Sequence, residues 1–186
     1  MVLLYATDVG DAAWQRMVRD GVVAVLGPGV GHAPSTERTS ALRAASLAAA
    51  VPRRATLAGP AALWVHGWRA NNAAPRRIDI AVPRGCHPDP PPGYFAPWWQ
   101  FVTDQSTCAA SRTVGGVSVT DVGNALRSLL CKGDLGEAVE AAWWALNEGK
   151  IDRASGAETI ASSATALPRQ RALAAWNAVC ATSGAP

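Results

Sequence analysis

The chain has 186 residues, 49% of them hydrophobic, so it can bury a sizeable core in one domain or in one domain with a small appendage. No apolar run reaches the ~18 to 20 residues of a membrane-spanning helix, and the N-terminus lacks the basic start and hydrophobic segment of a signal peptide. We therefore expect a cytoplasmic protein. Its formal net charge is +3, so the chain as a whole is not strongly basic.

The basic residues are concentrated toward the N-terminus. Residues 1–84 contain ten arginines and five acids, whereas residues 85–186 contain seven basic residues and nine acids. Such an asymmetry is expected when one face meets a polyanion and another meets a basic partner, although solvated faces also differ by chance.

The first predicted element is an amphipathic helix over Asp11 to Asp20, because apolar and polar residues recur there with helical spacing. Its inward residues would be Trp14, Met17 and Val18. Its outward residues would be Gln15, Arg16 and Arg19. We expect Asp11 to cap the start of this helix and Gly21 to end it.

A strand over Val22 to Leu26 and a tight turn at Gly27, Pro28 and Gly29 follow this helix. The succession is typical of the second half of a winged helix, in which a recognition helix enters the major groove and a wing lies along phosphates. The alternative is an ordinary amphipathic helix with solvated arginines. Because residues 1–10 leave little room for the preceding helices, we predict a truncated winged-helix segment over residues 1–34.

Residues Ser35 to Val51 form a second alanine-rich helical pattern, which ends before Pro52. Ser35 or Thr36 would cap it. Its inward residues would be Leu42, Ala45, Ser46 and Ala49. Arg38 and Arg43 would lie nearer the surface, where we predict that they extend the nucleic-acid-binding surface.

The segment Arg53 to Pro83 is the expected structural centre. Strands are predicted over Thr56 to Ala58 and over Ile78 to Val82, with a short buried helix between them at Pro60 to Trp68. Pro60 suits a first helical position because proline has no N–H to leave unpaired there. Gly67 suits the helix end.

This segment also partly resembles a polymerase-β-type nucleotidyltransferase, which has a glycine turn before a strand carrying Asp-x-Asp for two metals. Here Pro60 removes one phosphate donor, and Ala81 stands where the second carboxylate would be, so Asp79 alone cannot hold two metals. We expect His66 to be a buried, hydrogen-bonded structural residue rather than a catalytic one.

No metal site is predicted elsewhere. His32 and His87 have no metal-ligand spacing. The cysteines lack a C-x-x-C pair, which argues against zinc and against a disulfide framework, so we expect reduced, mostly buried thiols. They are Cys86, Cys108, Cys131 and Cys180.

The proline-rich stretch Gly85 to Pro97 predicts an exposed, stiff loop. Strands are expected over Trp98 to Thr103 and Thr113 to Thr120, with Gly115-Gly116 starting or bulging the second. Four helices follow by pattern: one begins at Val122, one at Leu135 after a stop and cap at Gly133-Asp134, one near Asp152 and one at Pro168.

The order of several short motifs resembles the actinobacterial branch of the AbiEi antitoxins of type IV toxin-antitoxin systems. The resemblance covers Asp8 to Lys150. The motifs are W-x-R-x-V-R-x-G-V (Trp14 to Val22), L-R-A-A-x-L (Leu42 to Leu47), A-x-x-W-V-H-G (Ala61 to Gly67), R-I-D-I-A-V-P (Arg77 to Pro83) and G-G-V-S-V-T (Gly115 to Thr120).

The resemblance implies a winged-helix DNA-binding module joined to an antitoxin domain, repression of the protein's own operon and neutralisation of a nucleotidyltransferase toxin, without enzymatic activity or a cofactor. The recognition helix would carry Gln15, Arg16 and Arg19, and the wing would carry Gly27 and Gly29. The signature residues expected to pack the domain are Trp64, His66, Gly67 and Asp79.

We therefore predict an α+β protein with a winged-helix segment over residues 1–34. Residues 35–186 would form an antitoxin domain with a small mixed sheet flanked by helices and a helical C-terminal part. The expected partners are operator DNA and a nucleotidyltransferase toxin. We expect no association with a membrane. The alternatives are a degenerate nucleotidyltransferase and a protein-interaction scaffold that uses Trp98, Trp99, Trp143 and Trp144.

Overall fold

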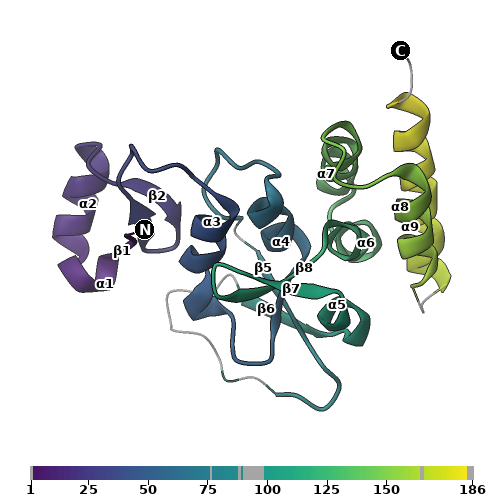
Figure 1. Ribbon diagram of the computed structural model, residues 1–186, viewed down its shortest axis with the longest axis horizontal. Coiled ribbons are helices and arrows are strands. Elements are labelled where there is room, and N and C mark those ends of the chain that lie inside the picture. The colour runs from purple at the N-terminus through teal and green to yellow at the C-terminus, as the bar shows by residue number, and fades with distance from the viewer. Residues whose placement is uncertain (1, 76, 88, 90–98, 164–165, 184–186) are drawn as a thin grey trace.

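The computed structural model describes residues 2–75, 77–87, 89, 99–163 and 166–183. The fold is α+β, as predicted: a small three-stranded sheet lies at the N-terminal end, a five-stranded mixed sheet lies in the middle, and helices follow toward the C-terminus (Figure 1). None of the helices in these ranges combines the length and apolar character needed to cross a membrane.

The N-terminal unit has one strand, then two helices, then two strands. It consists of β1 (Leu4–Tyr5), α1 (Ala6–Val9), α2 (Asp11–Arg19), β2 (Ala24–Gly27) and β3 (Val30–His32). The strands are antiparallel in the order β1-β3-β2. Helix α2 packs on this sheet through Trp14, which is 7% exposed, and a side chain on Gly31 would clash with Val23.

Two details of this unit differ from the sequence prediction. Asp11 is not the cap, because Gly10 occupies the N-cap position and Asp11 lies in the first turn of α2. Residues 2–10 are not merely a remnant, since Leu4 and Tyr5 pair with β3 and α1 leads directly into α2. The predicted helix end at Gly21 is confirmed, with a φ of 70° that favours glycine.

The second helical segment is shorter than its alanine content predicts. Helix α3 (Ser40–Ser46) starts five residues later than expected because the Thr39 hydroxyl, rather than Ser35 or Thr36, accepts a hydrogen bond from the Leu42 amide at 3.2 Å. A 3-10 turn, η1 (Ala48–Ala50), completes the segment before Pro52.

The five-stranded sheet has the order β6-β5-β4-β8-β7. Its strands are β4 (Thr56–Ala58), β5 (Ile78–Val82), β6 (Trp99–Thr103), β7 (Ser111–Val114) and β8 (Val117–Thr120). The pairs β5–β6 and β4–β8 are parallel and the other two are antiparallel. The buried helix α4 (Gly59–His66) joins β4 to β5 as predicted, with Pro60 in its first turn and Gly67 at its end.

The strand predicted over Thr113 to Thr120 is instead a hairpin. Gly115 and Gly116 have φ values of 54° and 84°, the two left-handed residues that a tight two-residue hairpin turn requires. The chain therefore reverses between β7 and β8. A short helix, α5 (Gln105–Ala109), precedes β7 and was not predicted.

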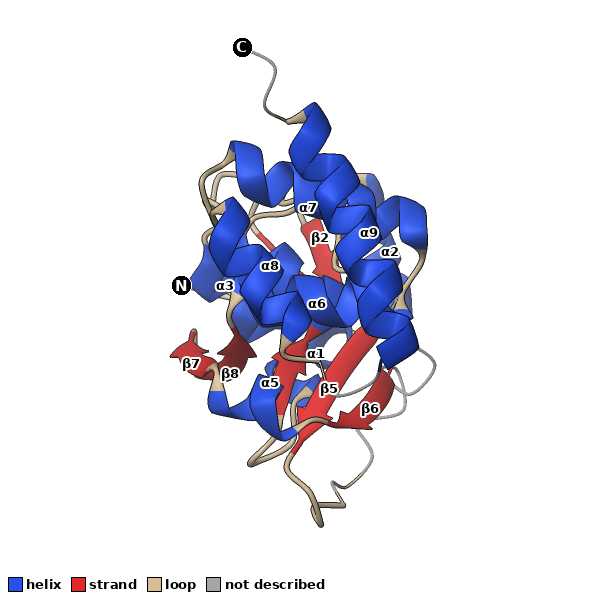
Figure 2. Ribbon diagram, turned by 90° about the vertical axis from the view of Figure 1, so that its right-hand side faces the viewer, coloured by secondary structure: helices blue, strands red, loops and turns tan. Residues whose placement is uncertain are grey.

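The C-terminal part contains the predicted helices: α6 (Val122–Lys132), α7 (Leu135–Asn147), α8 (Arg153–Ala161) and α9 (Ala166–Thr182). Asp121, Asp134 and Asp152 cap the first three by accepting backbone N–H hydrogen bonds at 2.7, 2.9 and 2.8 Å. Helix α6 packs between α4 and the other tail helices, which cover the end of the molecule facing the viewer in Figure 2.

Two stretches for which the sequence makes predictions are not fully described by the structure. Most of the proline-rich stretch from Gly85 to Pro97, and Trp98, lie outside the described residues. The cysteines are free thiols, but the expectation that they are mostly buried is wrong: Cys131 is buried and the other three are half-buried.

Candidate nucleic-acid interface and ligand pockets

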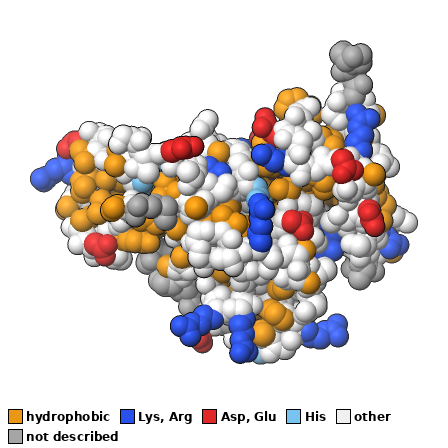
Figure 3. Space-filling model, viewed as in Figure 1, with side chains coloured by type: hydrophobic (Ala, Val, Ile, Leu, Met, Phe, Trp, Pro, Cys, Tyr) orange, Lys and Arg blue, Asp and Glu red, His pale blue; other side chains and the backbone are white. Residues whose placement is uncertain are grey.

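The predicted recognition face of α2 is open to solvent. Gln15, Arg16 and Arg19 are all exposed, and they lie within one turn of each other on the side of α2 away from buried Trp14. Arg19 forms an ion pair with Asp20, in which Arg19 Nε lies 3.4 Å from Asp20 Oδ1. Because both side chains are exposed, this ion pair is weak. Figure 3 shows basic side chains projecting from this end of the molecule.

The predicted wing is a short turn folded against the protein. Gly27 is buried and faces Leu47 and Ala74, so it cannot contact DNA as predicted. Gly29 is half-buried, and its carbonyl accepts a hydrogen bond from the Ala6 amide at 2.8 Å. Nucleic-acid recognition by this unit would therefore fall mainly on α2.

Arg43 does not lie near the surface, contrary to the prediction. It is 5% exposed, and its Nε and Nη2 donate hydrogen bonds to the Val65 carbonyl at 3.3 and 2.9 Å. Val65 lies in the last turn of α4, where carbonyls lack intrahelical partners. Arg43 also bonds the Arg38 carbonyl and Ser40 and lies over the Trp64 ring. Its role is to hold α3 against α4.

Arg38 is half-buried and links two parts of the fold. Its Nε donates to His32 Nε2 at 3.2 Å, and its Nη1 donates to the Asn71 carbonyl at 2.7 Å. The side chain therefore ties β3 to the loop after α4. Both contacts are made within the fold, so part of the hydrogen-bonding capacity of this guanidinium is already used.

The signature residues Trp64, His66 and Gly67 have packing roles. Trp64 is 1% exposed, and its Nε1 donates to the Asn72 carbonyl at 3.1 Å. His66 is half-buried, and its Nε2 donates to the Thr120 carbonyl at 2.7 Å, which connects α4 to β8. Burial lowers the pKa of His66, so the neutral ring is favoured. Gly67 ends α4 with a φ of 124°.

Asp79 lies beside Gly59 at the start of α4. A side chain on Gly59 would clash with Asp79 Oδ2, and Asp79 Oδ1 accepts a hydrogen bond from Arg77 Nε at 2.6 Å. Burial raises the pKa of Asp79 although Arg77 opposes this shift. Ala81 is buried two residues further along β5, and the described residues contain no cluster of three His, Cys, Asp or Glu side chains suited to a metal.

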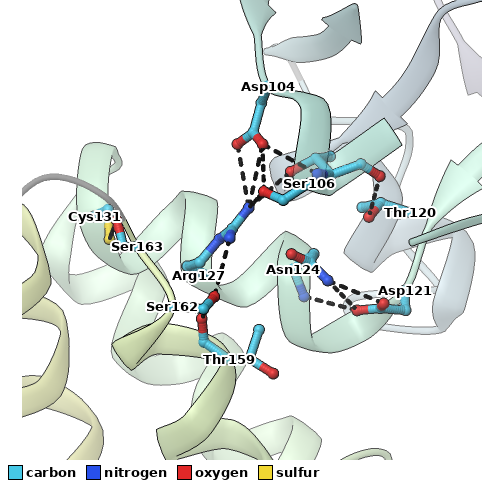
Figure 4. Close-up of polar contacts among 11 residues, drawn as sticks. Asp104, Ser106, Thr120, Asp121, Asn124, Arg127, Cys131, Thr159, Ser162 and Ser163 are labelled. Atoms are coloured by element: carbon cyan, nitrogen blue, oxygen red, sulfur yellow. Dashed lines mark hydrogen bonds and ion pairs between the residues drawn. The ribbon is translucent and has the colours of Figure 1, made fainter. Parts of the chain in front are cut away.

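A buried polar network, which sequence reasoning missed, joins α6 to the end of β6. Arg127 is 6% exposed, and its Nη2 lies 3.2 Å from Asp104 Oδ2 and 2.7 Å from Ser106 Oγ (Figure 4). The same atom lies 3.1 Å from Thr107 Oγ1. Burial tends to raise the pKa of Asp104, but hydrogen bonds from Ser106 and Thr107 and the charge of Arg127 outweigh it and lower this pKa. The guanidinium and carboxylate therefore neutralise each other.

A polar cavity lies at the start of α6. It has a volume of about 430 Å³ and is lined by His66, Arg112, Asp121, Lys150 and side chains of α8. Sequence reasoning did not identify Arg112 or Lys150, because β7 and the loop before α8 meet only in the folded chain.

One face of α7 carries exposed apolar side chains. Leu135, Val139 and Trp143 recur every four residues and are 45%, 38% and 53% exposed, whereas Trp144 is half-buried. On β6, Trp99 is half-buried and donates to the Ala50 carbonyl at 2.9 Å.

Comparison with known proteins gives a weak structural likeness. None of the protein-family models matches the chain, and none of the curated proteins does. The chain is similar to the crystal structure of the RV2827C protein from Mycobacterium tuberculosis, with 16% sequence identity and a TM-score of 0.48, over 100% of this chain and 78% of that chain. A similarity at this level assigns no function.

Proposed function

We propose that this protein is a non-catalytic antitoxin and transcriptional regulator of the AbiEi type that binds operator DNA through α2. The observation that carries the DNA half is the N-terminal unit: its strands have the order β1-β3-β2, and two helices precede β2 as in a winged helix. The helix in the recognition position exposes Gln15, Arg16 and Arg19.

These side chains suit a major-groove surface. Arginine reads guanine and glutamine reads adenine through paired hydrogen bonds, and both arginines also neutralise phosphates. Trp14 anchors the opposite side of α2 to the sheet, so the helix is presented rigidly. Because the turn at Gly29 is short and folded back, we expect little contribution from a wing.

A gel-shift titration against the DNA upstream of the gene, repeated at several salt concentrations, tests this proposal. We expect binding that weakens as salt rises, because phosphate contacts release counterions. The double variant Arg16→Glu, Arg19→Glu should bind at least roughly a hundredfold more weakly at low salt.

The matched control is Arg53→Glu, Arg54→Glu, which changes the charge equally at two exposed arginines outside the N-terminal unit. It should bind more tightly than the α2 variant. Equal losses in the two double variants, or no binding by the unaltered protein at low salt, would sink the assignment of α2.

The antitoxin half rests on the resemblance, whose signature segment forms α4 and β5 at the centre of the fold. It predicts a nucleotidyltransferase toxin encoded next to this gene. Co-expression of the two proteins should restore growth that the toxin alone arrests, and the Arg16→Glu, Arg19→Glu variant should still restore it. Growth arrest that persists with both proteins present would refute neutralisation.

A degenerate nucleotidyltransferase is the second candidate, favoured by the contact between Asp79 and Gly59 at the start of α4. Incubation with divalent metal, labelled nucleotide and tRNA distinguishes the two candidates. We expect no incorporation, because Asp79 has no second carboxylate beside it on β5. Incorporation that Asp79→Ala abolishes would favour the enzyme.

A further inference from the structure

The cavity lined by His66 lies where four parts of the chain meet: the end of α4, strand β7, the start of α6, and α8 with the loop before it. Its volume of about 430 Å³ is within the usual range of small-molecule sites. Apolar groups of Ala110, Val122 and Ile151 form part of its wall. The cavity can therefore hold a ligand with an uncharged body as well as a charged group.

The charges around this cavity are mainly positive. Arg112 and Lys150 are exposed at its edge, and neither forms an ion pair with any acid among the described residues. Asp121 is the acid in the lining, and its two oxygens already accept hydrogen bonds from Asn124. The lining therefore contains two cations without an acidic partner in the described part of the chain, Arg112 and Lys150, and one carboxylate, Asp121, that is already hydrogen-bonded.

His66 adds a fixed polar group. Its Nε2 carries the proton that is donated to the Thr120 carbonyl, so Nδ1 of the neutral ring is an acceptor. This atom has no hydrogen-bond partner among the described residues. It is suited to a hydroxyl group of a ligand held by the two cations.

The cavity beside Arg127 provides the contrast. It has a similar volume of about 420 Å³, but its buried guanidinium is paired with Asp104 and donates hydrogen bonds to three hydroxyl groups. Figure 4 shows Asp104, Ser106 and Ser162 around the guanidinium of Arg127. That arginine is occupied by the fold, whereas Arg112 and Lys150 are available to an anion.

We propose that the cavity between β7, α6 and α8 binds a small phosphorylated ligand, whose phosphate lies between Arg112 and Lys150 and whose hydroxyl-bearing body faces His66. A guanidinium and an ammonium together match the charge of a phosphate monoester, and the guanidinium offers a paired hydrogen-bonding geometry. The site shares no residue with α2, so it is separate from the proposed DNA surface.

Isothermal titration calorimetry on the full chain tests this proposal with three probes: inorganic phosphate, adenosine 5′-monophosphate and adenosine. We expect the monophosphate to bind, inorganic phosphate to bind more weakly and adenosine not to bind measurably. Arg112→Ala and Lys150→Ala should each weaken binding of the monophosphate about tenfold, since each removes one charge-assisted contact.

Both altered residues are exposed, so the variants should fold, and circular dichroism confirms this before titration. Arg153→Ala, at the exposed start of α8 outside the cavity lining, is the matched control and should bind as the unaltered protein does. Equal binding of adenosine and its monophosphate, no binding of either phosphate probe, or equal affinities in all variants would overturn the proposal. A single-stranded oligonucleotide is titrated as a further probe. If the oligonucleotide alone binds, and Arg112→Ala weakens that binding, the cavity is a nucleic-acid contact and the proposal is overturned.

Discussion

Helix α2 carries two arginines and helix α3 carries one, and the fold uses them differently. Arg16 and Arg19 on α2 are exposed, whereas Arg43 on α3 is 5% exposed and surrounded by acceptors. The difference comes from what each helix faces. Helix α2 turns its polar side to solvent, while α3 packs its arginine against the carbonyl end of α4.

The same contrast recurs in the rest of the fold. Arg127 is buried and paired with Asp104, and Arg69 forms an exposed ion pair with Glu137 and Glu140. An arginine that the fold already uses is unavailable to a ligand, and its loss should appear as lost stability. An arginine without internal partners should affect binding alone.

Replacing Arg43 should have the largest effect on stability. Arg43→Met keeps much of the side-chain volume but leaves the buried Val65 carbonyl without its donors, so we expect the free energy of unfolding to fall by about 3 kcal/mol. Urea unfolding at pH 7 measures this change. Arg16→Met is the control, and its effect should stay within roughly 0.5 kcal/mol because that side chain is exposed.

The opposite pattern would break the comparison. If Arg43→Met kept its unfolding midpoint and lost DNA binding, then Arg43 would be a nucleic-acid contact and the packing role given to it would be wrong.

Removal of Arg127 should have the next largest effect, and this effect should depend on pH. At pH 7, Arg127→Met leaves the carboxylate of Asp104 without its cation, so we expect a loss of about 2 kcal/mol. The pKa of Asp104 is lowered in the folded protein. Its contribution to stability is therefore present above the unfolded value of about 3.9 and is lost as pH falls through the folded pKa.

Urea unfolding at pH 7 and at successively lower pH checks this prediction. The difference between the unaltered protein and Arg127→Met should shrink in acid, once Asp104 is protonated. The double variant Asp104→Asn, Arg127→Met should be more stable at pH 7 than Arg127→Met alone, since it leaves no uncompensated carboxylate. A constant difference across pH would show that Arg127 acts through packing only.

The amphipathic and capped elements could be predicted from the sequence, because their signals are local. Helix α4 between Pro60 and Gly67, strand β5, and the Gly133-Asp134 boundary between α6 and α7 all follow from neighbouring residues. The hairpin at Gly115-Gly116 also had a local signal, since two adjacent glycines between β-branched residues favour a tight turn.

The polar sites could not be predicted in this way. Arg43 donates to the carbonyl of Val65, which is 22 positions away in the sequence. Arg127 pairs with the carboxylate of Asp104, which is 23 positions away. Arg112 and Lys150 share a cavity only because β7 and α8 meet at the start of α6. Helical spacing correctly predicts that Arg16 and Arg19 are exposed. It carries no information about a hydrogen-bond acceptor on another element, such as the Val65 carbonyl that binds Arg43.

Arg69 should give the smallest change in stability, and it separates the ion pair from the backbone. Its guanidinium lies 3.2 Å from Glu137 Oε1, also pairs with Glu140, and stacks at 4.5 Å over the Trp68 ring, while the residue itself has a left-handed φ of 50°. Arg69→Ala keeps the unfavourable backbone and loses these contacts, so we expect a loss of about 1 kcal/mol that diminishes in 1 M salt.

Arg69→Gly loses the same contacts but relieves the left-handed strain, which costs a non-glycine residue roughly 1 kcal/mol. It should therefore unfold at a higher urea concentration than Arg69→Ala and close to that of the unaltered protein. If Arg69→Gly were instead the less stable of the two, the strain assigned to the left-handed backbone would be wrong, because both variants lack the same guanidinium contacts.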